Sequence, residues 1–143
     1  MSARGGRALV IAAGVVVAAT VVAALVLTGT PGLQRQVRLD ERRVQDLVRL
    51  DTAIQAHARL HEGLPATLEA LDASAGRGLP RADPGTGAPY GYLAGKSGRY
   101  RLCAVFATDS VASAGGFTPE GWAHPAGRHC FERRVTDAGA TQR

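Results

Sequence analysis

The sequence predicts an α+β protein. An N-terminal transmembrane helix precedes a long amphipathic helix, which packs on a small antiparallel β-sheet of about three strands. Three observations predict this class. Residues 8–27 form an uncharged apolar run, residues 34–62 repeat apolar side chains at helical spacing, and strand-like segments bounded by turn residues fill the second half. Helices and strands that occupy separate parts of a chain are typical of α+β domains.

The apolar run consists of ALVIAAGVVVAATVVAALVL. A helix of this length, at about 1.5 Å of rise per residue, is roughly 30 Å long and matches the hydrocarbon core of a bilayer. A secretory signal peptide is the alternative, but its apolar region is usually about 7–15 residues long. The best cleavage site, Thr28-Gly29-Thr30, is followed by Pro31, which is a poor context for cleavage. We therefore expect an uncleaved anchor that contacts the lipid bilayer through residues 8–27.

The charges beside the anchor argue for both orientations. Arg4 and Arg7 in the short basic tail, residues 1–7, favour a cytoplasmic N-terminus. Four arginines beyond the anchor favour the reverse orientation: Arg35, Arg38, Arg42 and Arg43. We expect these side chains on a solvated helix face or against lipid headgroups. The short tail and the two cysteines decide for an inner-membrane, single-pass protein with a cytoplasmic N-terminus and an extracytoplasmic domain.

The first part of the domain is predicted to be a helix. After a linker at residues 28–33, one domain is expected over residues 34–135, which suffices for a modest core. Residues 34–62 carry the apolar stripe of a long helix, and Gly63 and Pro65 mark its end. Residues 64–71 predict a short helix or turn that places two leucines in the core.

The second part of the domain is predicted to be a sheet. Turn residues at 83–87 precede a strand at residues 90–93, and GKSG at residues 95–98 predicts a hairpin into the strand 99–106. In that strand Tyr100, Leu102, Ala104 and Phe106 alternate onto one face. A long loop at residues 107–127, a third strand at 128–135 and a flexible tail at 136–143 complete the domain.

The two cysteines, Cys103 and Cys130, each lie in a strand-like segment. Neither is part of a C-x-x-C pair, which excludes a thioredoxin motif and a zinc knuckle. Cysteines on neighbouring strands can reach disulfide distance, and closing this loop contributes about 3–4 kcal/mol. We expect a structural disulfide if the domain lies outside the cytoplasm, and two buried thiols if it lies inside.

Three segments follow the predicted apolar helix in a characteristic order: HARLHEGLPATLEAL, ADPGTGAPYGYL and GRYRLCAVF. This order resembles the type IV pilin-like domain, especially the major pseudopilin of type II secretion, over roughly residues 46–106. The matching positions are Gly63, Pro65, Leu68, Leu71, Asp83, Pro84, Gly87, Pro89, Tyr90 and Tyr92. The resemblance implies a pilin-like fold and an envelope location.

The chain departs from that pattern at its start. Pilin-like proteins have a leader-peptidase site before the apolar run and a glutamate inside it. Here Arg7 follows Gly6, no acidic residue lies in residues 8–27, and Gly85 replaces an expected Trp. The chain also resembles bacterial single-pass proteins that carry a pilin-like outer domain.

Few residues suggest metal chemistry. His57 and His61 lie four apart on one helix face, but no HExxH motif is present. They are weak metal candidates, and they would need His124 and His129 nearby. Asp109 and Glu120 offer too few oxygen ligands for calcium. We therefore expect no cofactor.

No motif predicts catalysis or nucleic-acid binding. Ser110 and Ser113 lack a G-x-S-x-G context, and Asp72 and Asp83 have the positions of turn-closing residues. The net charge of +5 forms no basic patch interleaved with aromatic residues. We expect a protein that is not an enzyme and does not bind nucleic acid.

The loop at residues 107–127 is a candidate contact for a protein partner through Phe117 and Trp122. In the alternative, Trp122 folds back over the sheet near the disulfide. The sequence predicts a membrane-anchored binding or scaffolding protein of the cell envelope. The alternatives are a pseudopilin-like filament or secretion subunit, and an envelope sensor that binds a metal or ligand.

Overall fold

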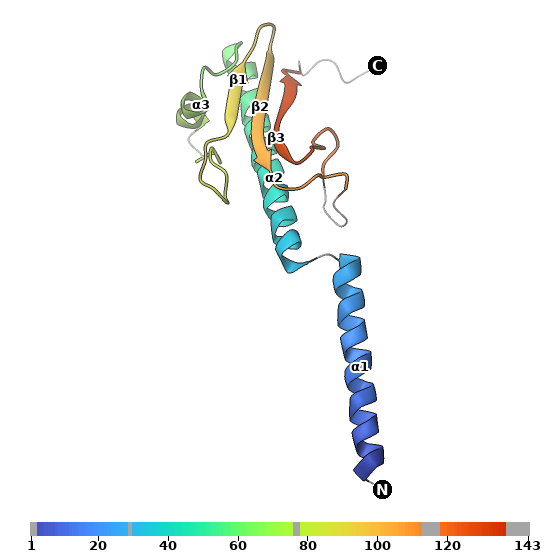
Figure 1. The fold of residues 1–143 in the computed structure, drawn as a ribbon. Helices are drawn as coiled ribbons and strands as arrows, with labels where there is room; N and C mark the ends of the chain where they lie inside the picture. The colour runs from blue at the N-terminus through green and yellow to red at the C-terminus, as the bar shows by residue number, and fades with distance from the viewer. Residues whose placement is uncertain (1–2, 29, 76–77, 113–117, 137–143) are drawn as a thin grey trace. The chain divides into compact units, whose positions relative to one another are not determined.

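The computed structural model describes residues 3–28, 30–75, 78–112 and 118–136. Three helices precede three strands (Figure 1). The predicted α+β class is confirmed. The bounds are α1 Ala3–Thr28, α2 Pro31–His61, α3 Leu68–Ala75, β1 Gly91–Ala94, β2 Arg99–Phe106 and β3 Gly127–Arg134. The chain divides into two compact units, residues 1–35 and 36–143, and each is described by itself.

Helix α1 contains the predicted anchor and is longer than residues 8–27 at both ends. By length and composition it lies in a helix that could cross a membrane. The large apolar side chains described along it are exposed, from 44% for Leu25 to 80% for Leu27. Exposed apolar side chains on all sides suit a lipid environment.

The predicted linker at residues 28–33 is too long, because α2 already begins at Pro31. Thr30 caps this helix: its Oγ1 accepts a hydrogen bond from Leu33 N at 3.4 Å, and its carbonyl accepts one from Gln34 N at 3.1 Å. A proline directly after such a cap is favoured, since its fixed φ suits the first helical turn.

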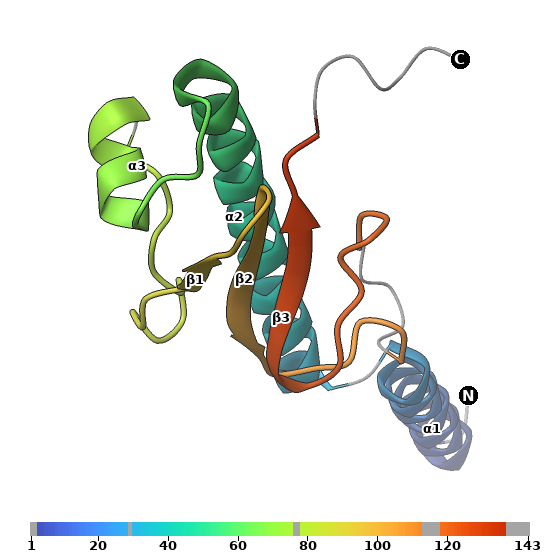
Figure 2. The same cartoon turned by 90° about the horizontal axis from the view of Figure 1, so that it is seen from above.

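The three strands form an antiparallel sheet in the order β1-β2-β3. The predicted alternation in β2 is confirmed, because Tyr100, Leu102, Ala104 and Phe106 are all buried. They pack against the apolar stripe of α2, and the shared core contains Val44, Leu47, Leu50, Ile54, Leu71 and Phe131. Figure 2 shows α2 lying across one face of the sheet.

Two helix ends differ from the prediction. Helix α2 ends at His61, one residue before the predicted end, and Glu62 after it adopts a left-handed conformation, φ 54°. Helix α3 begins at Leu68 instead of 64, because Thr67 is its cap and accepts a hydrogen bond from Ala70 N at 3.2 Å. Leu68 and Leu71 are buried, as predicted.

The predicted strands are confirmed with small shifts. Strand β1 begins at Gly91 instead of Tyr90, and β3 covers residues 127–134 instead of 128–135. The GKSG turn joins β1 to β2, with Gly95 N donating to Arg99 O at 2.7 Å. Most of the predicted tail, residues 137–143, lies outside the described residues.

Candidate functional site

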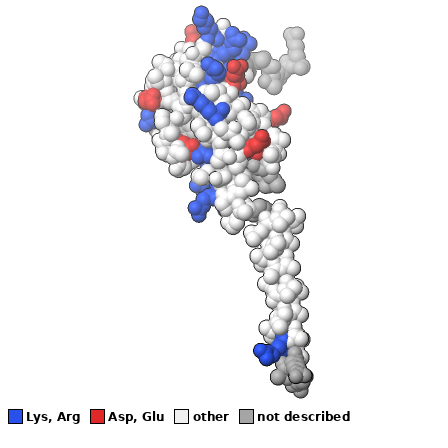
Figure 3. All heavy atoms as spheres, in the orientation of Figure 1, with Lys and Arg blue, Asp and Glu red and all other residues white. Residues whose placement is uncertain are grey.

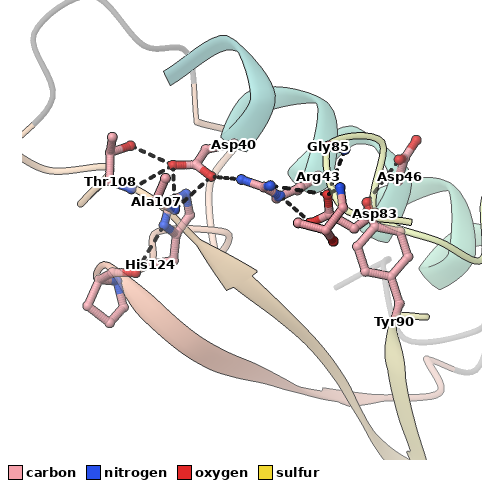
Figure 4. A network of polar contacts seen from close by, with 11 residues as sticks. Asp40, Arg43, Asp46, Asp83, Gly85, Tyr90, Ala107, Thr108 and His124 are labelled. Atoms are coloured by element: carbon pink, nitrogen blue, oxygen red, sulfur yellow. Dashed lines mark hydrogen bonds and ion pairs between the residues drawn. The ribbon is translucent and has the colours of Figure 1, made fainter. Parts of the chain in front are cut away.

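Arg43 is the centre of a buried polar network (Figure 4). Helix α2 places Asp40 and Arg43 three residues apart, so both side chains leave the same face of the helix. The guanidinium binds both carboxylate oxygens of Asp83, through Nε and through Nη2, the latter at 3.1 Å, and its Nη1 donates to Asp40 at 2.6 Å. Both acids pair with Arg43, so the predicted solvated position of this arginine is wrong.

Asp40 joins α2 to the end of β2. Its carboxylate accepts hydrogen bonds from Ala107 N at 3.0 Å, Thr108 N at 2.7 Å and Thr108 Oγ1 at 2.7 Å. These donors, together with Arg43, leave the buried carboxylate fully hydrogen-bonded. The interaction fixes the point where the chain leaves the sheet.

Asp83 joins α2 to the turn before β1. Its Oδ1 accepts Gly85 N at 2.7 Å and Thr86 N at 2.9 Å, and its own N–H donates to Ala88 O at 2.8 Å. Gly87, at φ +72°, supplies the left-handed residue that this turn needs. The prediction that Asp83 closes a turn is confirmed, and the bond to Arg43 is an addition to it.

The network favours the charged forms of Arg43 and Asp83. The hydrogen bond to Asp83 raises the pKa of Arg43, against the effect of burial, and the bond to Asp40 adds to the rise. Burial acts to raise the pKa of Asp83, but the hydrogen bonds from Arg43, Thr86 and Gly85 outweigh it and lower that pKa. These groups are therefore ion-paired at neutral pH and are not poised for proton transfer.

A groove lies between this turn and the end of β2. Tyr90 N donates to Arg81 O at 2.9 Å, and Pro89 forms a bridge with Ala82, so the chain before Gly91 pairs with residues 81–82 on the side away from β2. Strand β1 therefore pairs only with residues 100–103 of β2. Among the described residues, no strand pairs with the rest of β2 on this side.

The groove has a volume of about 520 Å³, within the usual range for binding pockets. Arg43, Tyr90 and Phe106 contribute buried side chains, and the Tyr90 hydroxyl donates to Asp46 at 3.0 Å. The full lining is Arg43, Asp83, Thr86, Ala88, Pro89, Tyr90, Gly91, Cys103, Ala104, Val105, Phe106, Ala107 and Arg128.

The predicted disulfide between Cys103 and Cys130 is present. The two residues lie directly opposite each other in β2 and β3, with Cα atoms 4.0 Å apart. Their side chains lie on the face that points away from α2, since Leu102 and Ala104 face the core. Gly91 packs on this bridge, because a Cβ there would lie 2.9 Å from the Cys103 Cβ.

Trp122 is not available as an exposed partner contact, because its side chain is only 5% exposed. It folds back over the sheet: its ring lies 4.7 Å from that of Phe131, and the Arg133 guanidinium lies 4.0 Å above it. Phe131 directly follows Cys130 and faces the core beside Leu102, so Trp122 packs on the core face of the sheet and the disulfide lies on the other face. Phe117 lies outside the described residues.

His57 and His61 lie together, with ring centroids 4.4 Å apart. Ser74 Oγ contacts His57 Nδ1 at 3.3 Å. Within the described ranges, no group of three or more His, Cys, Asp and Glu side chains gathers around a possible metal position. Burial, and then the charge of His61, lower the pKa of His57.

The other predicted candidates serve the loop itself. Asp109 Oδ1 accepts hydrogen bonds from Val111 N and Ala112 N, while Ser110 Oγ bonds the backbone N and O of His124 at 2.8 and 3.1 Å. His124 is buried and stacks on Phe106, 3.6 Å between ring centroids. Ser113 lies outside the described residues.

Sequence reasoning missed Asp40, Arg43 and Thr108. The Asp-x-x-Arg spacing on a helix was the one available signal, and the same spacing also forms ion pairs on solvated helix surfaces. No family model matches this chain, and neither a curated protein nor a solved structure matches it.

Proposed function

We propose that this chain is a single-pass membrane protein whose residues 34–135 form a pilin-like extracytoplasmic domain that binds another protein of the cell envelope. Residues 8–27 anchor it in the inner membrane, with the basic tail in the cytoplasm. The observation that supports an extracytoplasmic location is the Cys103–Cys130 disulfide, in a chain whose helix α1 could cross a membrane. Stable disulfides belong to oxidising compartments.

Binding rather than catalysis is supported by the groove beside β2. The buried ionisable side chains in its lining, Arg43 and Asp83, form an ion pair with each other. Arg43 also binds Asp40 outside the groove, and both acids accept further backbone hydrogen bonds. A largely apolar groove with a few polar side chains suits recognition of a partner.

The pilin-like assignment is supported by the packing of α2 on a three-stranded antiparallel sheet. This architecture also favours the second candidate, a pseudopilin-like subunit of a filament or secretion system. The uncharged segment at residues 8–27 weighs against that candidate, because pilin-like subunits carry an acidic residue there.

Labelling with a membrane-impermeant maleimide tests the location. Lys96→Cys lies in the exposed β1–β2 turn, and we expect it to react in intact spheroplasts. The matched control, Ser2→Cys in the basic tail, should react only after the membrane is permeabilised. The reverse pattern would place the domain in the cytoplasm and contradict the proposal.

A further inference from the structure

The outer face of the sheet, which points away from α2, is the strongest remaining feature. Its side chains alternate along the strands with those of the core face. Among the described residues, no helix or strand covers this face, whereas α2 covers the other one (Figure 2). The exposed side chains on it are Leu93, Arg99, Arg101, Val105, Arg128, Glu132 and Arg134. Four arginines therefore share an open face with a single acid.

Three of these arginines gather at the hairpin end of the face. Arg99 lies directly opposite Arg134, and Arg101 follows two residues later in β2. Figure 3 shows Lys and Arg side chains clustered at this end of the domain. Side chains directly opposite each other on an antiparallel pair lie about 5 Å apart at Cβ, and like charges there destabilise the sheet. An anion bound on this face would relieve that repulsion.

The arginines of the outer face do not pair within the domain. None of the four forms an ion pair with a described residue, whereas Arg43 and Arg81 elsewhere in the domain both do. A guanidinium presents a planar fork that binds a carboxylate through two parallel hydrogen bonds. The outer face therefore offers several such donors to carboxylates outside the domain.

Apolar side chains and the groove adjoin the arginines. Leu93 is 49% exposed and Val105 59% exposed on the same face. Val105 and Arg128 lie opposite each other and both line the groove beside β2, so the groove opens onto the outer face. From Arg99 to Val105 the strand extends about 20 Å, which is the length of an extended segment of six residues.

We propose that the outer face binds an acidic segment of a partner protein, with carboxylates on the arginines of the hairpin end and apolar residues beside Val105 and the groove. The inference rests on the proposed binding function and names the chemistry of the partner. A second copy of the chain does not suit this face, because a two-fold contact would bring the arginines of both copies together.

A short peptide of that pattern tests the proposal. The probe is DEDLVE, blocked at both ends and labelled with fluorescein, and fluorescence anisotropy measures its binding to the full disulfide-bonded chain in phosphatidylcholine nanodiscs. At about 0.15 M salt, where distant charges are screened, we expect saturable binding. NQNLVQ, which replaces each carboxylate by an amide, should bind at least about tenfold more weakly. DEDSSE, which lacks the apolar residues, should bind at least about threefold more weakly.

Two charge reversals give the matched comparison. Arg99→Glu should weaken DEDLVE binding by about tenfold or more. The same variant should raise the midpoint of thermal unfolding, because a glutamate opposite Arg134 replaces a repulsive pair by an attractive one. Arg49→Glu makes the same charge change at an exposed position of α2 and should change binding by less than about twofold.

Four results would overturn the proposal: no binding of DEDLVE, equal binding of NQNLVQ, equal binding of DEDSSE, or equal effects of the two reversals on binding. Sedimentation of the nanodiscs with phosphatidylglycerol vesicles that depends on Arg99, without binding of DEDLVE, would assign the outer face to a lipid surface and equally contradict it. None of these outcomes alters the maleimide pattern, so the proposed location stands or falls separately.

Discussion

Arg43 connects segments that lie far apart in the sequence. Its guanidinium binds Asp83, forty residues away, and Asp40, whose carboxylate in turn binds Thr108. A buried carboxylate that loses its cation is left with an uncompensated charge. The stability of the groove walls therefore depends on this one side chain.

Removal of the arginine is the first prediction. Arg43→Met leaves two buried acids unpaired, so the free energy of unfolding should fall by about 3–5 kcal/mol. Denaturant unfolding followed by the single tryptophan, Trp122, measures it. Arg42→Met removes an exposed neighbour and should change stability by less than about 0.5 kcal/mol. Equal effects would show that the network does not stabilise the fold.

His124 gives the fold a dependence on pH. Burial is the largest influence on its pKa and lowers it, and the charge of His129 lowers it further. The carbonyl of Pro125 and the charges of Asp40 and Asp109 act to raise the pKa, but the net shift is downward. The unfolded chain takes up the proton near pH 6.5, whereas the folded chain resists it. The resulting stability is complete above pH 6.5 and is lost as the pH falls toward the folded pKa.

Replacement of His124 by a ring that does not titrate tests this effect. His124→Phe retains an aromatic ring against Phe106 and should flatten the decline in unfolding free energy between about pH 7 and 5. For wild type we expect a slope of at most about 1.4 kcal/mol per pH unit from this group. His61→Phe, at an exposed position, should retain the wild-type slope, and a flattened slope there would contradict the assignment.

Residues of this kind were only partly predictable. Asp83 was assigned to a turn because Asp closes turns through local hydrogen bonds. Its bond to Arg43 depends on which face of α2 meets the sheet, a tertiary contact that local sequence does not encode. The sequence therefore predicts the same exposed position for Arg43 as for Arg35, Arg38 and Arg42. Of these four arginines, Arg43 alone is buried.

At the scale of elements, α2 is the support of the sheet. Leu50 is fully buried in the core shared with β2 and β3, while Leu60, on the same helix, is 79% exposed. Leu50→Ala should lower the free energy of unfolding by about 2–5 kcal/mol, and Leu60→Ala by less than about 0.5 kcal/mol. Both variants replace Leu by Ala in α2, so the change in helix propensity is the same in each. The difference between their thermal unfolding therefore measures core packing.

The disulfide is the second element-scale contribution. It joins residues 27 apart in sequence, and loss of that constraint on the unfolded chain costs about 3–4 kcal/mol. The double variant Cys103→Ala with Cys130→Ala should be destabilised by this amount in denaturant titrations. A change below about 1 kcal/mol would mean that the bridge adds little to the ladder between β2 and β3.

Element type was easier to predict than element ends. Strand β2 followed from its alternation, because burial of one face imposes a period of two. Helices α2 and α3 begin at other residues than predicted because Thr30 and Thr67 act as their caps. Which cap forms is decided by small free-energy differences.

At the scale of the whole molecule, the parts agree with one another. An apolar helix that could cross a membrane precedes a small domain with its own buried core. Small domains of this size gain from a covalent staple, which the chain supplies at Cys103–Cys130. Under the proposed function, this disulfide forms because the domain lies outside the cytoplasm, on an anchor that is retained.

Intact mass measures that claim most directly. The protein is extracted from native membranes and alkylated, first without reduction and then after it. We expect the full-length mass, no alkyl group before reduction and two afterwards, one on each cysteine. Immediate addition of two groups would show free thiols and a reducing compartment, and a mass shortened at the N-terminus would show a cleaved leader. Either result would contradict the account.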